Sequence, residues 1–127
     1  MTADEHFPRA RRLLRPTEFA RVYSARCTAA QGPLVLYAAP RDTPEGPARL
    51  GVSVSRRIGN AVIRNRWKRR LREAFRRVQG NLSPGNDYII VVRSGRPEEG
   101  EEGARRTERM IVQLAGRTAS RPRGRER

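Results

Sequence analysis

The chain has 127 residues, which is enough for one compact domain with a single hydrophobic core and too few for two. Lysine and arginine total 28 against 13 acidic residues, and the formal net charge of +15 makes nucleic acid the first candidate partner. Cys27 is the one cysteine and His6 the one histidine, which excludes an internal disulfide and a cysteine–histidine zinc cluster. No signal-peptide pattern and no run of about 18 apolar residues occurs, so we expect a cytoplasmic protein without membrane contact.

The first predicted elements are an irregular lead-in and a short helix. Residues 1–12 mix charges with few apolar positions and are expected to be flexible. Pro16 followed by Thr17 is typical of a helix start, with Thr17 as the N-cap of a helix over Glu18–Ala25. Three apolar residues recur on one face of this helix: Phe19, Val22 and Tyr23.

Two strands are predicted next, joined by a loop rich in proline and glycine. Leu34–Ala38 has the composition of a strand, and residues 41–47 have that of a loop. In the second strand, Leu50–Ser55, one face is apolar and the other small and polar: Leu50, Val52 and Val54 against Gly51, Ser53 and Ser55. We expect the two strands to pair antiparallel.

The longest predicted element is a helix that begins at Asn60, runs to Val78 and is ended by Gly80. Between residues 64 and 77 it carries eight cations and one acid, Glu73. Solvated helix faces ordinarily mix acids with bases to form ion pairs, so this face is predicted to bind a polyanion. At about 100 degrees per residue, the apolar positions share an arc of about 120 degrees that is expected to pack on the sheet: Ile63, Trp67, Leu71, Ala74, Phe75 and Val78.

The remaining chain predicts a strand, a loop, a helix and a tail. Tyr88–Val92 is uniformly apolar, as expected of a strand in the interior of a sheet. Residues 94–103, rich in glycine and glutamate, form a loop before a helix over Ala104–Ala115, whose apolar stripe holds Met110, Ile111 and Leu114. Residues 117–127 are expected to be a disordered basic tail. The element order αββαβα predicts an α+β two-layer sandwich over residues 13–116.

The side chains suggest binding rather than catalysis. No nucleophile beside a base, no paired carboxylates and no metal-ligand cluster occurs. Phosphate contacts from the cationic helix supply affinity without sequence information, so specificity requires shape or a second surface. Aromatic rings can stack on unpaired bases, although a place in the core is the more common role for the three candidates: Phe19, Tyr23 and Tyr37.

The segment from Gly51 to Phe75, GVSVSRRIGNAVIRNRWKRRLREAF, closely resembles the signature of the bacterial ribonuclease P protein subunit family. It includes that family's Arg-Asn-Arg motif at residues 64–66. The first helix and the strands Leu34–Tyr37 and Asp87–Val92 stand in the family's order, so the resemblance covers about residues 13–114.

The resemblance implies a ribosomal protein S5 domain 2-like fold with a left-handed βαβ crossover, the rarer hand for such connections. It implies that catalysis and its magnesium ions belong to the RNA subunit; the sequence itself shows no side chains that would hold a metal. The implied partners are ribonuclease P RNA and precursor tRNA, whose 5′ leader is removed by endonucleolytic cleavage to give the mature 5′ end. No obligate protein partner is evident.

Carried onto this sequence, the resemblance implies two groups of binding residues. The first would bind ribonuclease P RNA: Arg56, Arg57, Asn60, Arg64, Asn65, Arg66, Lys68, Arg69 and Arg72. The second would line a cleft for the precursor-tRNA leader between the first helix and the sheet: Phe19, Tyr23, Tyr37, Ser53 and Ser55. Asn60 is an equally good candidate for a helix cap. Trp67 replaces the family's usual aliphatic residue, and the acidic loop 94–103 disfavours RNA contact beside it.

Two other classes of protein fit part of this pattern. A ribosomal or other structural RNA-binding protein would share the charge and possess a similar fold, but it would not alter the cleavage of precursor tRNA. A DNA-binding regulator would need varied side chains that reach base edges, whereas the long helix offers mainly groups suited to phosphate.

Overall fold

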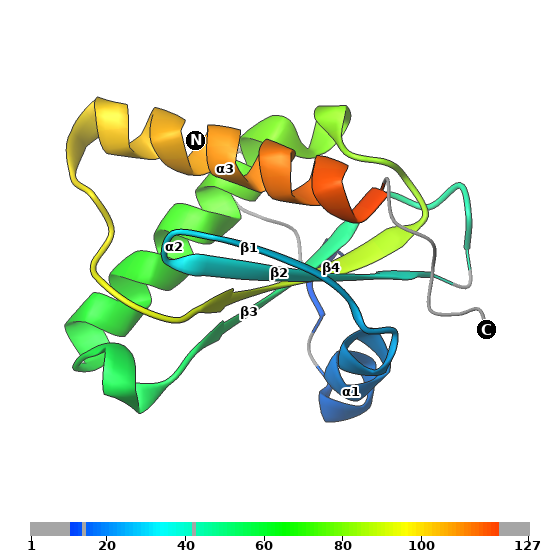
Figure 1. Ribbon diagram of the computed structural model, residues 1–127, viewed down its shortest axis with the longest axis horizontal. Coiled ribbons are helices and arrows are strands. Elements are labelled where there is room, and N and C mark those ends of the chain that lie inside the picture. Colours follow the sequence, from blue (N-terminus) through cyan, green and yellow to red (C-terminus); the bar gives the residue numbers. More distant parts are fainter. Residues whose placement is uncertain (1–10, 14, 42, 120–127) are drawn as a thin grey trace.

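The computed structural model describes residues 11–13, 15–41 and 43–119, so most of the predicted lead-in and tail lies outside the described residues. Three helices and four strands make up this described part, together with two short 3-10 turns (Figure 1). In chain order the elements are α1 (Pro16–Ser24), β1 (Cys27–Gln31), β2 (Leu34–Pro40), β3 (Arg49–Val54), η3 (Arg56–Ile58), α2 (Ala61–Val78), η4 (Gln79–Asn81), β4 (Asn86–Val92) and α3 (Gly100–Ala119).

The four strands form one sheet in the order β1-β2-β4-β3. β4 pairs antiparallel with β2 and parallel with β3, which confirms the predicted interior strand. The predicted antiparallel pairing of Leu34–Ala38 with Leu50–Ser55 is wrong, because β4 lies between them. From Tyr88 to Val92 β4 is apolar, which suits an interior position with a strand paired at each of its edges. The parallel pair is joined through α2; the left hand of this crossover stays a prediction.

Strand β1 is missing from the predicted order, which becomes αβββαβα. Its sequence, CTAAQ, has no alternation of large apolar and polar residues. β1 forms a hairpin with β2 through a two-residue turn, and its small side chains allow α3 to pack closely on this edge strand. The Cys27 thiol, for example, donates to the Thr118 carbonyl at 3.4 Å.

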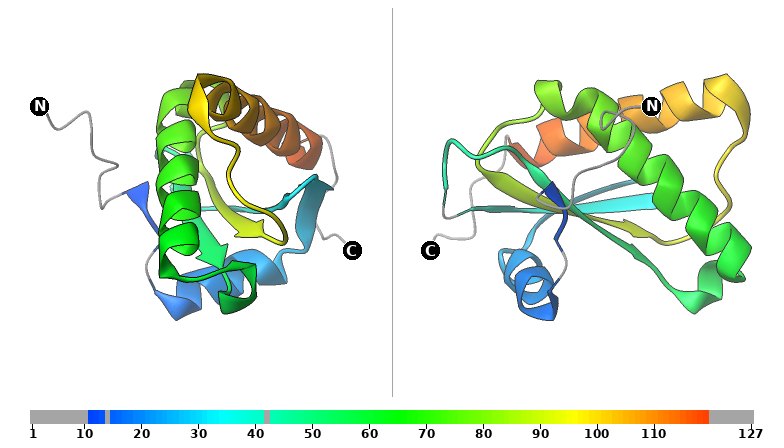
Figure 2. Two further views of the ribbon diagram at one scale, coloured as in Figure 1. Left: turned by 90° about the vertical axis from the view of Figure 1, so that its left-hand side faces the viewer. Right: turned by 180° about the vertical axis from the view of Figure 1, so that it is seen from behind.

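Helices cover both faces of the sheet. α2 and α3 lie side by side on one face, and the shorter α1 lies on part of the other (Figures 1 and 2). The predicted two-layer sandwich therefore describes the larger side, while α1 adds a partial third layer. A large hydrophobic cluster fills the first interface and a small one the second, the latter built on Leu13, Val22, Ala39 and Ile89.

The apolar stripe of α2 is buried as predicted, in all six positions: Ile63, Trp67, Leu71, Ala74, Phe75 and Val78. Asn60 is the N-cap, since its side-chain oxygen accepts a hydrogen bond from the Ile63 amide at 3.0 Å. Trp67 is 3 % exposed, and its indole nitrogen donates to the Gly95 carbonyl at 2.9 Å. The larger residue thus extends the core and ties α2 to the loop before α3.

Two predicted helix ends are displaced. The N-cap of α1 is Arg15 rather than Thr17, because Pro16 takes the first helical position that suits proline. α3 begins at Gly100, earlier than the predicted Ala104, since glutamates in its first turn favour the helix dipole. It also continues through Ala119, so residues 117–119 are helical and not part of a disordered tail.

Candidate nucleic-acid interface

The residues expected to bind ribonuclease P RNA all lie on α2 or immediately before it, and each is exposed or half-buried. Arg56 and Arg57 are in η3, and Asn60 caps the helix. The remaining six, which we call the α2 face, lie on α2 outside its six buried positions: Arg64, Asn65, Arg66, Lys68, Arg69 and Arg72.

The cations of α2 spread over two flanks of the helix. One flank turns toward the edge of β3, where Arg12 forms an isolated bridge with Leu50. Burial lowers the pKa of Arg72, and the like charge of Arg12 lowers it further, so the described N-terminal segment adds a cation to this flank. The other flank turns toward α3, where Arg66 lies 3.7 Å from a Glu99 carboxylate oxygen.

The acid within α2, Glu73, is already engaged by its own helix. Its carboxylate accepts hydrogen bonds from Arg76 at 2.6 Å and from Arg77 at 3.1 Å. The Arg76 hydrogen bond is the main reason why the pKa of Glu73 lies below its usual value, although burial opposes this. Glu73 therefore offsets the cations at the C-terminal end of α2 and leaves the α2 face positive.

The acidic segment before and within the first turn of α3 is largely neutralised locally. Glu98 pairs with Arg106 at 3.1 Å, and Glu101 pairs with Arg105 at the same distance. Among the described ion pairs of this segment, the one formed by Glu99 reaches α2. Of the carboxylates expected to disfavour RNA contact near this segment, Glu99 is therefore the one that is paired with α2.

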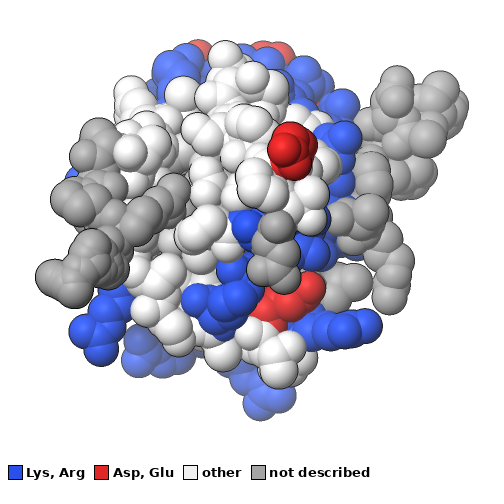
Figure 3. All heavy atoms as spheres, turned by 90° about the vertical axis from the view of Figure 1, so that its right-hand side faces the viewer, with Lys and Arg blue, Asp and Glu red and all other residues white. Residues whose placement is uncertain are grey.

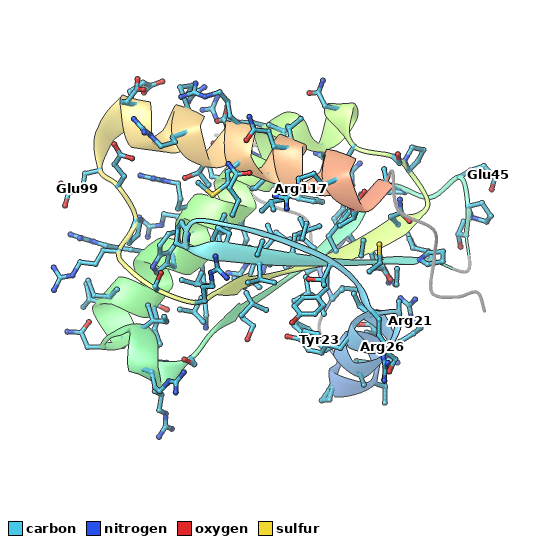
Figure 4. All side chains as sticks on the ribbon, viewed as in Figure 1. Arg21, Tyr23, Arg26, Glu45, Glu99 and Arg117 are labelled. Carbon is cyan, nitrogen blue, oxygen red and sulfur yellow. The ribbon has the colours of Figure 1, made fainter. Side chains whose placement is uncertain are left out.

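The three candidate aromatic residues come together between α1 and the sheet. The rings of Tyr23 and Tyr37 meet edge to face with centroids 4.8 Å apart, and Phe19 lies 6.4 Å from Tyr23. Phe19 covers Gly51, where a Cβ atom would stand 2.7 Å from the ring. Phe19 and Tyr37 thus also cover the small core, whereas Tyr23 is 36 % exposed at the rim (Figure 4).

The two predicted serines extend this aromatic group toward α2. Burial raises the pKa of the Tyr23 hydroxyl, and a hydrogen bond with Ser53 lowers it in part. Ser53 and Ser55 also line a hollow of about 380 Å³ with Arg57 and Arg93, at the ends of β3 and β4. The ring contacts, the Tyr23–Ser53 hydrogen bond and the shared hollow thus connect the five residues expected to bind the leader: Phe19, Tyr23, Tyr37, Ser53 and Ser55. We call this group the α1 cleft, after the cleft expected there, and it leads to the turn before α2.

A buried ion network that sequence reasoning missed holds α1 against the sheet. Asp87 of β4 is fully buried, and Arg49 of β3 donates two hydrogen bonds of 2.8 Å to its carboxylate. Arg21 of α1 donates to the same carboxylate and, at 2.8 Å, to the Pro40 carbonyl. Figure 3 shows basic side chains gathered around acidic ones at this end of the molecule. The signal in the sequence that could have indicated this network was a single acid, Asp87, directly before the apolar residues 88–92 of β4.

The described residues contain no group of three histidine, cysteine, aspartate or glutamate side chains that could hold a metal ion. Within the same residues, no helix is long and apolar enough to cross a membrane. What remains is a cationic helix face next to an aromatic, hydroxyl-lined cleft on a small α+β domain. These features are those of an RNA-binding protein.

Comparison with known proteins identifies the family. The family model described as Ribonuclease P matches residues 7–116. The chain is 43% identical over 89 residues to the ribonuclease P protein component of Brevibacillus brevis, covering 68% of each chain. It is 33% identical over 106 residues to that of Geobacillus thermodenitrificans, covering 83% of this chain and 86% of the relative.

Solved structures show the same fold. The ribonuclease P protein of Staphylococcus aureus superposes with a TM-score of 0.65 at 25% identity, over 84% of this chain and 93% of the other. That of Thermotoga maritima superposes with a TM-score of 0.59 over 81% and 89%. The chain belongs to the ribonuclease P protein component family. It is a protein subunit of a ribonucleoprotein endoribonuclease that processes the 5′ leader of tRNA, and the catalytic role lies in the RNA subunit.

Proposed function

We propose that this chain binds ribonuclease P RNA through the α2 face and η3, and the 5′ leader of precursor tRNA in the α1 cleft. The observation that carries the proposal is that the two surfaces meet. Ser53 bonds Tyr23 in the cleft and shares a hollow with Arg57, which lies in the turn that leads into α2. A protein placed on the catalytic RNA by α2 would thereby hold the leader next to it.

The α2 face suits a folded RNA more than a particular sequence. Its arginines offer planar donor forks that match phosphate oxygens. Asn65 is exposed and can both donate and accept, which suits a ribose 2′-hydroxyl group. Asn60 has its side-chain oxygen occupied by the helix cap, so its amide nitrogen is the group left for RNA.

The α1 cleft suits a single strand. Unpaired bases can stack on aromatic rings at about 1–3 kcal/mol each, whereas paired bases keep their faces covered. Tyr23 offers the most exposed ring, and the hydroxyl groups of Ser53 and Ser55 can bond bases or phosphates. We expect the leader to contact this cleft and the mature tRNA body to lie elsewhere.

We further propose that the magnesium ions needed for cleavage are held by the RNA subunit, where the catalytic role lies. The chain's own contribution is charge: two RNAs repel each other, and a domain of net charge +15 between them reduces the repulsion. We expect this association to take place in the cytoplasm.

The proposal is tested by cleavage of precursor tRNA by ribonuclease P RNA over a magnesium titration, with and without the full chain. We expect the protein to lower the magnesium concentration needed for cleavage. Mature-end formation that is unchanged by the protein at low magnesium would contradict the proposal. The variant Arg109→Gln serves as a control: this exposed arginine lies on α3, outside both surfaces, so the variant should act like the parent chain.

A further inference from the structure

A second hollow lies between α2 and the loop that leads into α3, where it adjoins the α2 face and shares Asn65, Arg66 and Arg69 with it. Its volume is about 600 Å³, within the range of about 300–1,000 Å³ typical of small-ligand sites. Figure 1 shows this loop running beside the first half of α2. We call this hollow the α2 pocket. The residues that line it include Val62, Arg66, Arg69 and Arg70 of α2 and Pro97 and Glu99 of the loop.

The loop that forms one wall is held in place. Trp67 donates to the Gly95 carbonyl, which fixes the loop where it leaves β4. At the other end Gly103 lies so close to Glu98 that a Cβ atom would stand 2.1 Å from its carbonyl oxygen. The α2 pocket is therefore largely preformed, which lowers the entropic cost of binding.

Part of the pocket wall is apolar. Val62 is 61 % exposed and, with Tyr23, is one of two large hydrophobic side chains exposed among the described residues. Pro97 faces the same hollow from the loop. An apolar wall contributes nothing to phosphate binding, but it can cover the flat face of a base.

The rest of the wall is cationic and incompletely paired. The Nη1 atom of Arg70 is buried without a hydrogen-bond partner among the described residues, an arrangement that is costly unless a ligand supplies an acceptor. Arg69 has no ion pair within this same part of the chain. Arg66 faces Glu99 at 3.7 Å, and both side chains are more than half exposed, so this pair is weak.

We propose that the α2 pocket receives an unpaired nucleotide of ribonuclease P RNA. Its base lies against Val62 and Pro97, and its phosphate accepts hydrogen bonds from Arg66 and from the buried nitrogen of Arg70. Glu99 lies on the loop far from α1 (Figure 4). When the nucleotide binds, its phosphate replaces the Glu99 carboxylate as the partner of Arg66. Proteins commonly recognise RNA through such splayed bases. The inference rests on the proposed function and adds a shape-selective contact to it.

The test measures the affinity of the full-length chain for ribonuclease P RNA over a salt titration. Val62→Asn should weaken binding about three- to tenfold with an unchanged salt slope, because it removes an apolar contact and no charge. Val62→Ile, the conservative control, should bind like the parent. Arg70→Gln should weaken binding and reduce the slope of log affinity against log salt by about 0.7–0.9, the contribution of one phosphate contact.

Glu99→Gln gives the opposite sign. Removing this carboxylate should strengthen RNA binding about two- to threefold, since phosphate no longer competes with it for Arg66. Weaker binding by Glu99→Gln, or parental binding by Val62→Asn, would overturn the inference. A photoreactive residue at position 62 supplies a third readout: crosslinks to unpaired nucleotides support the inference, and crosslinks to paired nucleotides or to a protein overturn it.

Failure of this inference is distinguishable from failure of the proposed function. Lys68→Glu combined with Arg72→Glu lies outside the lining of the α2 pocket and tests the α2 face alone. If this pair weakens RNA binding while Val62→Asn does not, the pocket assignment fails and the proposed function stands. If neither has an effect, the assignment of α2 to ribonuclease P RNA fails.

Discussion

The α2 face and the α1 cleft meet different physical demands. The α2 face consists of charged side chains on the side of the helix that the core does not use, since its six buried positions are elsewhere. The α1 cleft is built from rings that also cover the small hydrophobic cluster under α1. Binding and stability are therefore separable on α2 and coupled in the cleft.

The largest effect is expected from Asp87→Ala. Removing this fully buried carboxylate leaves the largely buried Arg49 and the partly exposed Arg21 without their shared partner, a loss of about 3–5 kcal/mol. Urea unfolding measures the effect, with the exposed Glu45→Ala as the control. Because the network holds α1 on the sheet, leader binding should fall with stability. A folded but destabilised Asp87→Ala variant that binds the leader like the parent would break the proposed coupling.

The reversal pair Lys68→Glu and Arg72→Glu should give the next largest effect. It removes two phosphate contacts at about 1.5 kcal/mol each, and should reduce the slope of log affinity against log salt by about 1.5. The free energy of unfolding should change little, since neither side chain belongs to the buried stripe. A salt slope equal to that of the parent would show that this face is only solvated.

Tyr23→Ala should cost about 1–2 kcal/mol in affinity for leader-bearing tRNA and nothing for mature tRNA, because the lost ring is a stacking surface. The comparison is made with the assembled holoenzyme. Tyr23→Phe keeps the ring and loses the Ser53 hydrogen bond, so it separates stacking from the hydroxyl. Equal losses for both tRNAs would return Tyr23 to a purely structural role.

Glu73→Gln should have the smallest effect, a few tenths of a kcal/mol in stability, since Glu73 forms partly exposed pairs within one helix. The hydrogen bond from Arg76 holds the pKa of Glu73 below its ordinary value of 4.5. Its contribution is therefore present above pH 4.5 and lost as the pH falls through the lower folded-state pKa. The stability difference between variant and parent should narrow accordingly. A difference independent of pH would contradict this account.

The sequence predicts α2 better than any other part of the molecule. Its period of 3.6 residues identifies the buried stripe in all six positions, because one continuous helix carries the whole signal. β1 could not be predicted because its small residues carry no strand pattern of their own. They suit close packing against α3, which is a contact between distant segments. The strand order escapes prediction for the same reason: only the assembled sheet shows that β4 lies between β2 and β3.

The candidate site shows the same limit. The residues of the α2 face follow from local sequence and from resemblance to a family. The α2 pocket needs the loop before α3. The network around Asp87 needs Arg21 of α1, Arg41 in the loop after β2 and Arg49 of β3, which no local pattern brings together. Long-range contacts thus determine how the two surfaces are supported, while local sequence determines which side chains they display.

The central claim is that one chain holds the catalytic RNA with α2 and the leader with the α1 cleft. The most direct test is the affinity of the assembled holoenzyme for precursor tRNAs whose leaders differ only in length. We expect the affinity to rise as the leader lengthens through the cleft and then to level off, and Tyr23→Ala to reduce this rise. An affinity that does not depend on leader length in the parent would contradict the claim.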